Sequence, residues 1–250
     1  GVHIGSGASY NKIANNVIAG HYIPSLLFAG TGIQLTGTAT TGNVITGNSI
    51  GVNANGNRLG NEVGILVQGG AHHTIIGGNR DESCEDPCNI ISGNESVGIL
   101  VKGTGTSSTL IIGNYIGVAN DDTAVGNGWN TEQVATPGGV VVALGATDTS
   151  IGGPRPTGDC SGPCNVIGGN TGAGITIASA NTSRTYVRGN FIGTASDGIT
   201  ALPNESGVLV AQGASDNDIG DSQCESGSSS SCVIPGPNVG SDARGLGSCI

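Results

Sequence analysis

The four residues Gly64-Ile65-Leu66-Val67 are one copy of a phrase, Gly-[Ile/Val]-x-[Ile/Val/Leu], that returns throughout the chain. Its copies begin at Gly32, Gly64, Gly98, Gly139, Gly174 and Gly207, at intervals of 32 to 41 residues. Each copy places aliphatic, often β-branched residues beside a glycine, which is typical of a short strand bounded by a tight turn. Recurrence at a nearly fixed period predicts a repeat architecture.

Two further strand phrases follow each copy in a constant order. The second is a Val/Ile run that ends in glycine, as in Asn43-Val44-Ile45-Thr46-Gly47. The third alternates between Ile-Gly, as in Tyr115-Ile116-Gly117, and Asn-[Ile/Val]-Ile, as in Asn89-Ile90-Ile91. Three strands in each of about six coils predict a three-faced solenoid, whose coils bury their apolar faces only by stacking. Successive coils run in the same direction, so each face is predicted to be a parallel sheet with right-handed connections.

The alternation of the third phrase makes the larger repeat two coils long. We therefore predict an all-β fold, a right-handed parallel β-helix, as one domain over residues 1–250. Its three two-coil units are predicted at about 16–88, 89–164 and 165–238. The alternative all-β fold is a sandwich, which needs hairpin turns between neighbouring strands and does not repeat a three-part order.

The composition excludes several classes of partner. The net charge is −10, with 8 basic and 18 acidic residues, so no basic surface is available to neutralise nucleic-acid phosphates. No apolar stretch approaches the roughly 20 residues that a membrane-spanning helix needs, and no signal peptide is seen. We therefore expect no nucleic acid and no membrane insertion, and we interpret the chain as a mature or trimmed product.

The placement of the seven cysteines indicates an oxidising, extracellular or cell-surface location. Six fall into local pairs, each after an Ile-Gly-Gly or Ile-Gly-Asp phrase: Cys84 with Cys88, Cys160 with Cys164, and Cys224 with Cys232. A zinc site is the alternative, but it requires four Cys or His ligands close together, often from Cys-x2-Cys spacings. The spacings here are Cys-x3-Cys twice and Cys-x7-Cys once. We predict three disulfides. Cys249 is left over and is predicted to be unpaired or bonded to another molecule.

The phrases Asn-Val-Ile-x-Gly-Asn and Gly-Asn-x-Ile-Gly-[Val/Thr] resemble the right-handed β-helix repeats of large bacterial extracellular and cell-surface proteins. The resemblance covers about Asn16 to Asn238 and implies the fold of the pectate-lyase-like superfamily. It implies little about function, because that fold carries lyases, hydrolases, adhesins and passive stalks alike.

No catalytic residue is predicted. Hydrolysis of a glycosidic bond needs two carboxylates about 5–10 Å apart, and the strand phrases hold almost no acidic residues, with Asp218 as the main exception. The acids lie instead in loops such as 81–86 and 121–122. These loops suggest Ca²⁺, which takes six to eight oxygen ligands, yet neither an EF-hand nor a nonapeptide array is present. We therefore predict no metal and no cofactor, with Ca²⁺ as the alternative.

Asparagines recur after glycine at the predicted strand ends, where stacked side chains can bond to the turns of adjacent coils and form ladders. They are Asn48, Asn94, Asn114, Asn170 and Asn190. Glycosylation sequons occur at Asn94, Asn181 and Asn204. We expect Asn94 to be structural, because it belongs to the ladder set, and Asn181 and Asn204 to be the better acceptors.

The remaining features point to a surface protein. Trp129 stands alone in the longest insertion, where it either covers the coil beneath it or contacts a partner. Residues 1–5 already resemble a strand and 233–250 show no helical cap, so we expect open ends that continue into further coils or stack end-to-end in a filament. We thus predict an extracellular structural or adhesive protein that binds itself or other surface proteins and glycans. The alternative is a secreted polysaccharide lyase or glycoside hydrolase.

Overall fold

The computed structural model describes residues 1–22, 30–80, 87–129, 138–154 and 160–220, and these residues form three parallel sheets. Sheet A contains β1 (Val2–Ile4), β4 (Thr31–Thr36), β7 (Val63–Gln68), β10 (Val97–Lys102), β13 (Gly138–Ala143), β16 (Ala173–Ala178) and β19 (Ser206–Ala211). Sheet B contains β2 (Lys12–Ala14), β5 (Val44–Thr46), β8 (Ile75–Gly77), β11 (Leu110–Ile112), β14 (Ser150–Gly152), β17 (Tyr186–Arg188) and β20 (Asp218–Ile219). Sheet C contains β3 (Val17–Ile18), β6 (Ser49–Ile50), β9 (Ile90–Ile91), β12 (Tyr115–Ile116), β15 (Val166–Ile167) and β18 (Phe191–Ile192).

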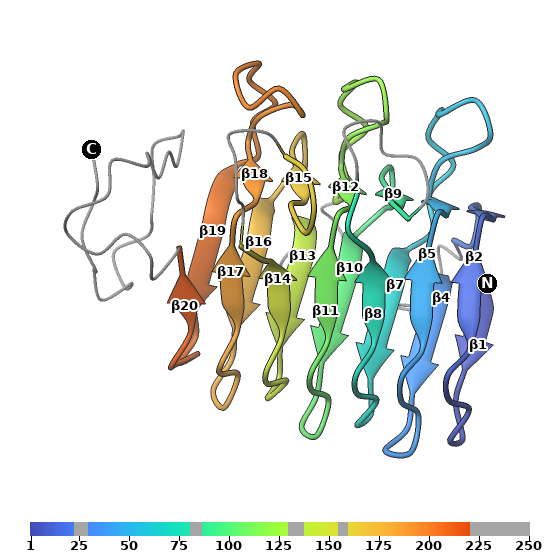
Figure 1. Cartoon of the computed structure of the whole chain (residues 1–250), viewed down its shortest axis with the longest axis vertical. Coiled ribbons are helices and arrows are strands. Elements are labelled where there is room, and N and C mark those ends of the chain that lie inside the picture. The colour runs from blue at the N-terminus through green and yellow to red at the C-terminus, as the bar shows by residue number, and fades with distance from the viewer. Residues whose placement is uncertain (23–29, 81–86, 130–137, 155–159, 221–250) are drawn as a thin grey trace.

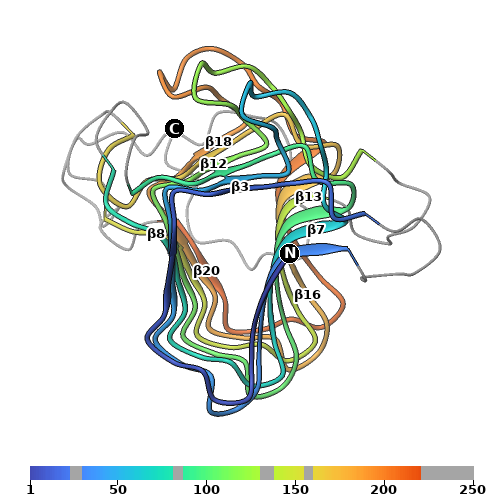
Figure 2. The same cartoon turned by 90° about the vertical axis from the view of Figure 1, so that its right-hand side faces the viewer.

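The predicted three-faced parallel β-helix is confirmed. The chain passes through sheets A, B and C in turn and makes six complete coils before β19 and β20 (Figures 1 and 2). One difference concerns where the coils begin. The first complete coil starts at Val2, one repeat before the copy at Gly32, because β1 pairs in register with β4, and Gly1-Val2-His3-Ile4 is itself a further copy of the phrase.

The core is a stack of aliphatic side chains inside the coils. Equivalent residues of neighbouring coils lie in register, as Ile65 does with Ile33 and with Ile99, and all three are completely buried. Isoleucine and valine make up most of this stack, since the narrow interior is filled by small branched side chains rather than aromatic ones. The low aromatic content of the sequence therefore follows from the width of the coil.

Two asparagine ladders run the length of the rod at its corners. The B–C ladder joins sheets B and C through Asn16, Asn48, Asn89, Asn114, Asn165 and Asn190. The C–A ladder joins sheets C and A through His21, Asn61, Asn94, Asn127, Asn170 and Asn204. In both, an interior amide donates to the Oδ1 of the next coil and to a strand carbonyl of the previous coil, as Asn94 does to Ile50. Buried polar groups are thereby satisfied, and each coil is fastened to both neighbours.

The corner between sheets A and B shows why the repeat is two coils long. Three coils carry a buried threonine in this turn, and the hydroxyl of each accepts a hydrogen bond from a glycine N–H of the coil before. Those pairs are Gly7 with Thr40, Gly70 with Thr106, and Gly145 with Thr182. The alternate coils carry a buried alanine instead, at Ala71 and Ala146. At this corner each threonine-bearing coil is therefore hydrogen-bonded to the coil before it.

The insertions line up along the rod, as expected for a solenoid. Hairpin loops leave sheet C in alternate coils and are closed by the antiparallel bridges Val52–Arg58, Val118–Ala124 and Thr194–Ala201. They form the row of loops at the top of Figure 1. Two of them touch, because Asp122 accepts hydrogen bonds from the backbone N–H and the hydroxyl of Ser196. None of the described residues forms a helix that could cross a membrane.

Candidate functional site

One predicted disulfide is present in the described residues. Cys160 and Cys164 are bonded, with their Cα atoms 5.2 Å apart, and both are buried. Cys88 is also disulfide-bonded, while its predicted partner Cys84 lies outside the described residues. The predictions for Cys224, Cys232 and Cys249 also fall outside the described residues.

Arg80, which precedes the Cys84–Cys88 pair in the sequence, contacts the segment that contains the Cys160–Cys164 disulfide. This side chain is 4% exposed, and its Nε donates to the carbonyl of Cys160 over 2.7 Å. Its guanidinium lies 4.7 Å from the ring centroid of Tyr115, which is buried. Tyr115 and Phe191 therefore pack into a cluster with Cys88 and do not form an exposed aromatic stripe on sheet C.

The three sequons occupy different environments. Asn94 is fully buried in the C–A ladder, as expected for a structural residue. Asn204 belongs to the same ladder: its side chain accepts a hydrogen bond from Asn170 and donates one to the carbonyl of Ile167. From its position in a loop, we had expected it to be a glycosylation site. Asn181 is exposed in the turn between β16 and β17. Of the three, Asn181 offers its amide most openly.

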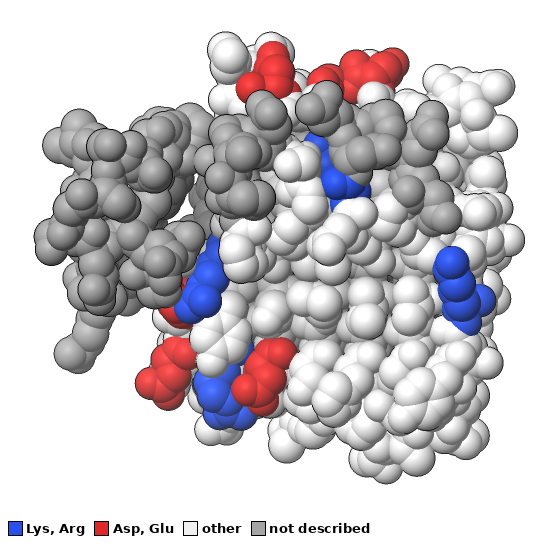
Figure 3. Space-filling view, in the orientation of Figure 1, with Lys and Arg blue, Asp and Glu red and all other residues white. Residues whose placement is uncertain are grey.

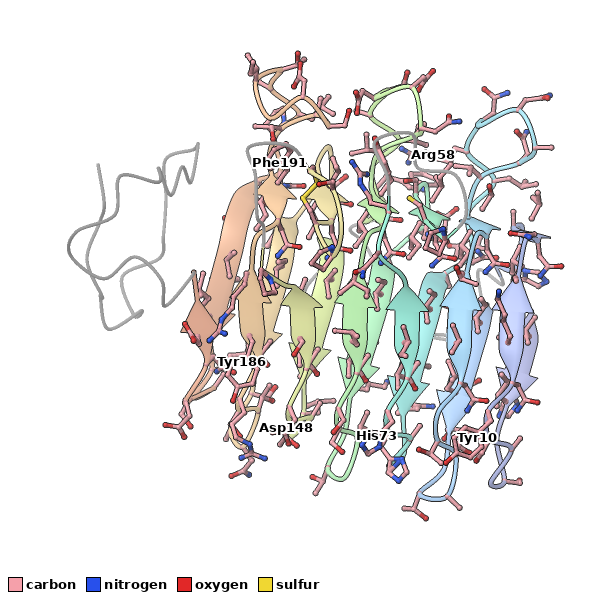
Figure 4. The ribbon with its side chains drawn as sticks, in the orientation of Figure 1. Tyr10, Arg58, His73, Asp148, Tyr186 and Phe191 are labelled. Atoms are coloured by element: carbon pink, nitrogen blue, oxygen red, sulfur yellow. A yellow bond between two sulfur atoms is a disulfide. The ribbon has the colours of Figure 1, made fainter. Side chains whose placement is uncertain are left out.

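Trp129 lies next to a cluster of charged residues at the corner between sheets C and A. Its ring is partly exposed, and the guanidinium of Arg58 lies 5.2 Å from the ring centroid. Arg58 comes from the hairpin loop of an earlier coil, toward the top of Figure 4. Burial lowers the pKa of Arg58, and the nearby carboxylate of Glu95 opposes that shift.

Glu95 and Glu62 form a pair of buried carboxylates in adjacent coils, 7% and 1% exposed. The backbone places them in register, because Glu95 N–H donates to Asn61 and Ser96 N–H donates to Glu62. Each follows an asparagine of the C–A ladder. Since that asparagine points into the rod, the alternation of an extended chain turns the glutamate outward. Glu62 also accepts a hydrogen bond from the N–H of Gly30 at 3.4 Å.

Neither acid was predicted from the sequence, although the sequence contains a signal for them. The segments Gly60-Asn61-Glu62 and Gly93-Asn94-Glu95 each precede a Val-Gly-Ile-Leu-Val strand. Their shared position in the repeat places them side by side on the rod. Two carboxylates thus lie in adjacent coils near an arginine and a tryptophan, but both acids are covered, whereas the arginine and the tryptophan are partly exposed.

No group of three or more potential metal ligands comes together in the part of the chain that the structure describes. Comparisons with protein-family models, with curated proteins and with solved structures return no match to this chain. The resemblance to bacterial surface β-helices and to the pectate-lyase-like superfamily therefore rests on the sequence phrases alone.

Proposed function

We propose that the protein is an extracellular structural or adhesive surface protein, in which a stiff β-helix presents rows of loops to glycans or surface proteins. The observation that supports this most strongly is the pair of continuous ladders, in which Asn48, Asn89, Asn114 and Asn165 at one corner are almost fully buried. Every coil is fastened to the next by side chains as well as by sheets, which favours a rod that keeps its shape under load.

The Cys160–Cys164 disulfide supports the extracellular location, because disulfides persist in oxidising compartments. The acidic net charge of −10 favours neutral or basic partners over anionic ones. Binding to a panel of immobilised neutral and anionic polysaccharides and matrix proteins tests the proposal. We expect retention of at least one of them, with the polysaccharides recovered uncut. Binding to none of them would contradict an adhesive role.

A glycoside hydrolase is the second candidate, and the Glu62–Glu95 pair favours it. Neighbouring strands in a sheet lie about 4.8 Å apart, and retaining glycosidases hold their two carboxyl groups about 5–5.5 Å apart. In this candidate one glutamate protonates the leaving oxygen while the other attacks the sugar, and the first then acts as a base for the water that hydrolyses the glycosyl-enzyme and frees the second glutamate. Release of reducing ends by the wild type, and its loss in both Glu62→Gln and Glu95→Gln, would establish this activity in place of simple binding.

A further inference from the structure

A column of outward residues runs along the corner between sheets A and B, which we call the edge column. In seven successive coils the residue two positions before each sheet B strand has a left-handed backbone, with φ between 51 and 65°. The column consists of Tyr10, Gly42, His73, Ser108, Asp148, Arg184 and Asp216. Glycine adopts this conformation without strain, yet six coils place a side chain there. Such repeated strain indicates that the side chains themselves have a role.

Tyr10 forms an exposed aromatic platform at one end of the column. Its side chain is 82% exposed, far more than any other described tyrosine, which makes it unusual in a chain with few aromatic residues. A Cβ on Gly42 would lie 2.6 Å from ring atoms Cδ1 and Cε1 of Tyr10. The ring therefore lies against the backbone of the next coil, in a position from which a side chain on residue 42 would displace it. This contact limits the orientations of the ring, which lowers the entropy lost on binding.

Polar groups continue the edge column beyond this platform. His73 is exposed and meets His72 edge to face, with ring centroids 5.1 Å apart. Farther along, Arg184 donates two hydrogen bonds to Asp148, at 2.6 and 2.8 Å. Both side chains of this ion pair remain about half exposed, at 50% and 40%. Figure 4 shows Tyr10, His73, Asp148 and Tyr186 along the same edge of the rod.

The charges along this edge largely cancel. Arg184 pairs with Asp148, and Arg188 of the neighbouring sheet B face pairs with Asp218. In Figure 3 the charged side chains of this view gather toward its margins, and much of the area between them is uncharged. The edge therefore differs from the strongly acidic chain as a whole, and it suits a ligand without charge.

We propose that the edge column binds a neutral, linear polysaccharide lying along the rod axis, with Tyr10 stacking on one sugar ring. Successive coils are about 4.8 Å apart, comparable to the length of one sugar ring in an extended chain, so successive column residues meet successive sugars. The His73 ring and the Asp148–Arg184 pair then hydrogen-bond to hydroxyl groups. This inference rests on the proposed adhesive function and names its ligand class.

Biolayer interferometry with immobilised protein and soluble glucan, xylan, mannan and polygalacturonate tests it. We expect Tyr10→Ala to weaken binding of a neutral polysaccharide about tenfold, because it removes the stacking surface, and Tyr10→Phe to retain it. Arg184→Ala gives a second, independent loss at the other end of the column. The matched control is Ile199→Ala, which removes an equally exposed apolar side chain from a loop tip. Circular dichroism confirms that each variant is folded.

Unchanged binding by Tyr10→Ala and Arg184→Ala would overturn the edge-column site while leaving an adhesive function in place. Loss of binding in Trp129→Ala alone would do the same and would move the site to the corner between sheets C and A. Binding that is restricted to polygalacturonate, and that is abolished by about 0.5 M salt, would exclude a neutral ligand. A wild type that binds no glycan and no matrix protein would instead contradict the proposed function itself.

Discussion

The side-chain amide of Asn94 donates to the Oδ1 of Asn127 over 2.9 Å, and neither side chain has any exposed surface. The same contact repeats along the corner of the rod, so polar side chains link the coils at positions as fully buried as those of the aliphatic core. Because an unsatisfied buried amide costs about 1–3 kcal/mol, these links specify the register of the coils as well as stabilising it.

Replacing Asn127 by alanine is expected to destabilise the protein by about 3 kcal/mol, since it leaves the donors of Asn94 and the carbonyl of Ile91 without their partner. Urea unfolding followed by circular dichroism measures this change. Asn55→Ala, in an exposed loop, is the matched control and should stay within about 0.5 kcal/mol of the wild type. Equal stability of the two variants would show that the ladder contributes little.

Gly64→Ala is expected to cost about 2–4 kcal/mol. A Cβ at Gly64 would lie 2.5 Å from the carbonyl oxygen of Gly98 and 2.8 Å from Nδ2 of Asn94, so the neighbouring coil would have to move. Gly207 holds the same place in the last sheet A strand, but its Cβ would meet only Ile192 at 3.7 Å. Gly207→Ala should therefore be tolerated. Thermal unfolding compares the two, and similar melting temperatures would argue against close packing of the coils.

Replacing both Cys160 and Cys164 by serine is expected to lower the free energy of unfolding by about 2 kcal/mol. This is the stabilisation expected when a disulfide closes so short a loop and lowers the conformational entropy of the unfolded chain. The effect should be nearly absent when the wild type is first reduced, because the two proteins then share the same open loop. Unfolding with and without reductant provides the measurement. A reductant-independent difference would mean that the serines disturb packing rather than the crosslink.

The Asp148–Arg184 pair predicts a small pH dependence. Its hydrogen bond from Arg184 holds the pKa of Asp148 below the ordinary value. A lowered folded-state pKa gives stability that is present above the unfolded pKa of about 3.9 and lost as pH falls through the folded pKa. Because both side chains are exposed, the effect should stay under about 1 kcal/mol. Asp148→Asn should thus melt slightly below the wild type at pH 7 and together with it near pH 2. A gap that persists in acid would contradict this.

The fold was predictable because the apolar phrases recur in a fixed three-part order, and Ile65, Ile76 and Ile91 do fall on three different sheets of one coil. The ladders were predicted only in part. Asn48, Asn114 and Asn190 follow a glycine, whereas Asn89 and Asn165 of the same ladder follow a cysteine loop. Contacts between coils depend on spatial register, and insertions of different length hide that register in the sequence.

The candidate sites were harder to predict for the same reason. Glu62 and Glu95 are 33 residues apart, and only the pairing of adjacent coils makes them neighbours. Tyr10 lies in a turn outside the strand phrases, and its position over Gly42 depends on a left-handed backbone that no sequence motif predicts. These candidate sites depend on single residues in turns, whereas the repeated phrases predict only the strands and core of the β-helix.

The chain length of a bound polysaccharide decides most directly between a protein that holds glycans and one that cuts them. A neutral polysaccharide that the wild type retains would be incubated with it for a day, eluted and sized by chromatography, beside the Glu62→Gln/Glu95→Gln double variant. We predict the same, undiminished length from both proteins. Shortened chains with new reducing ends from the wild type, and intact chains from the double variant, would contradict a purely adhesive function.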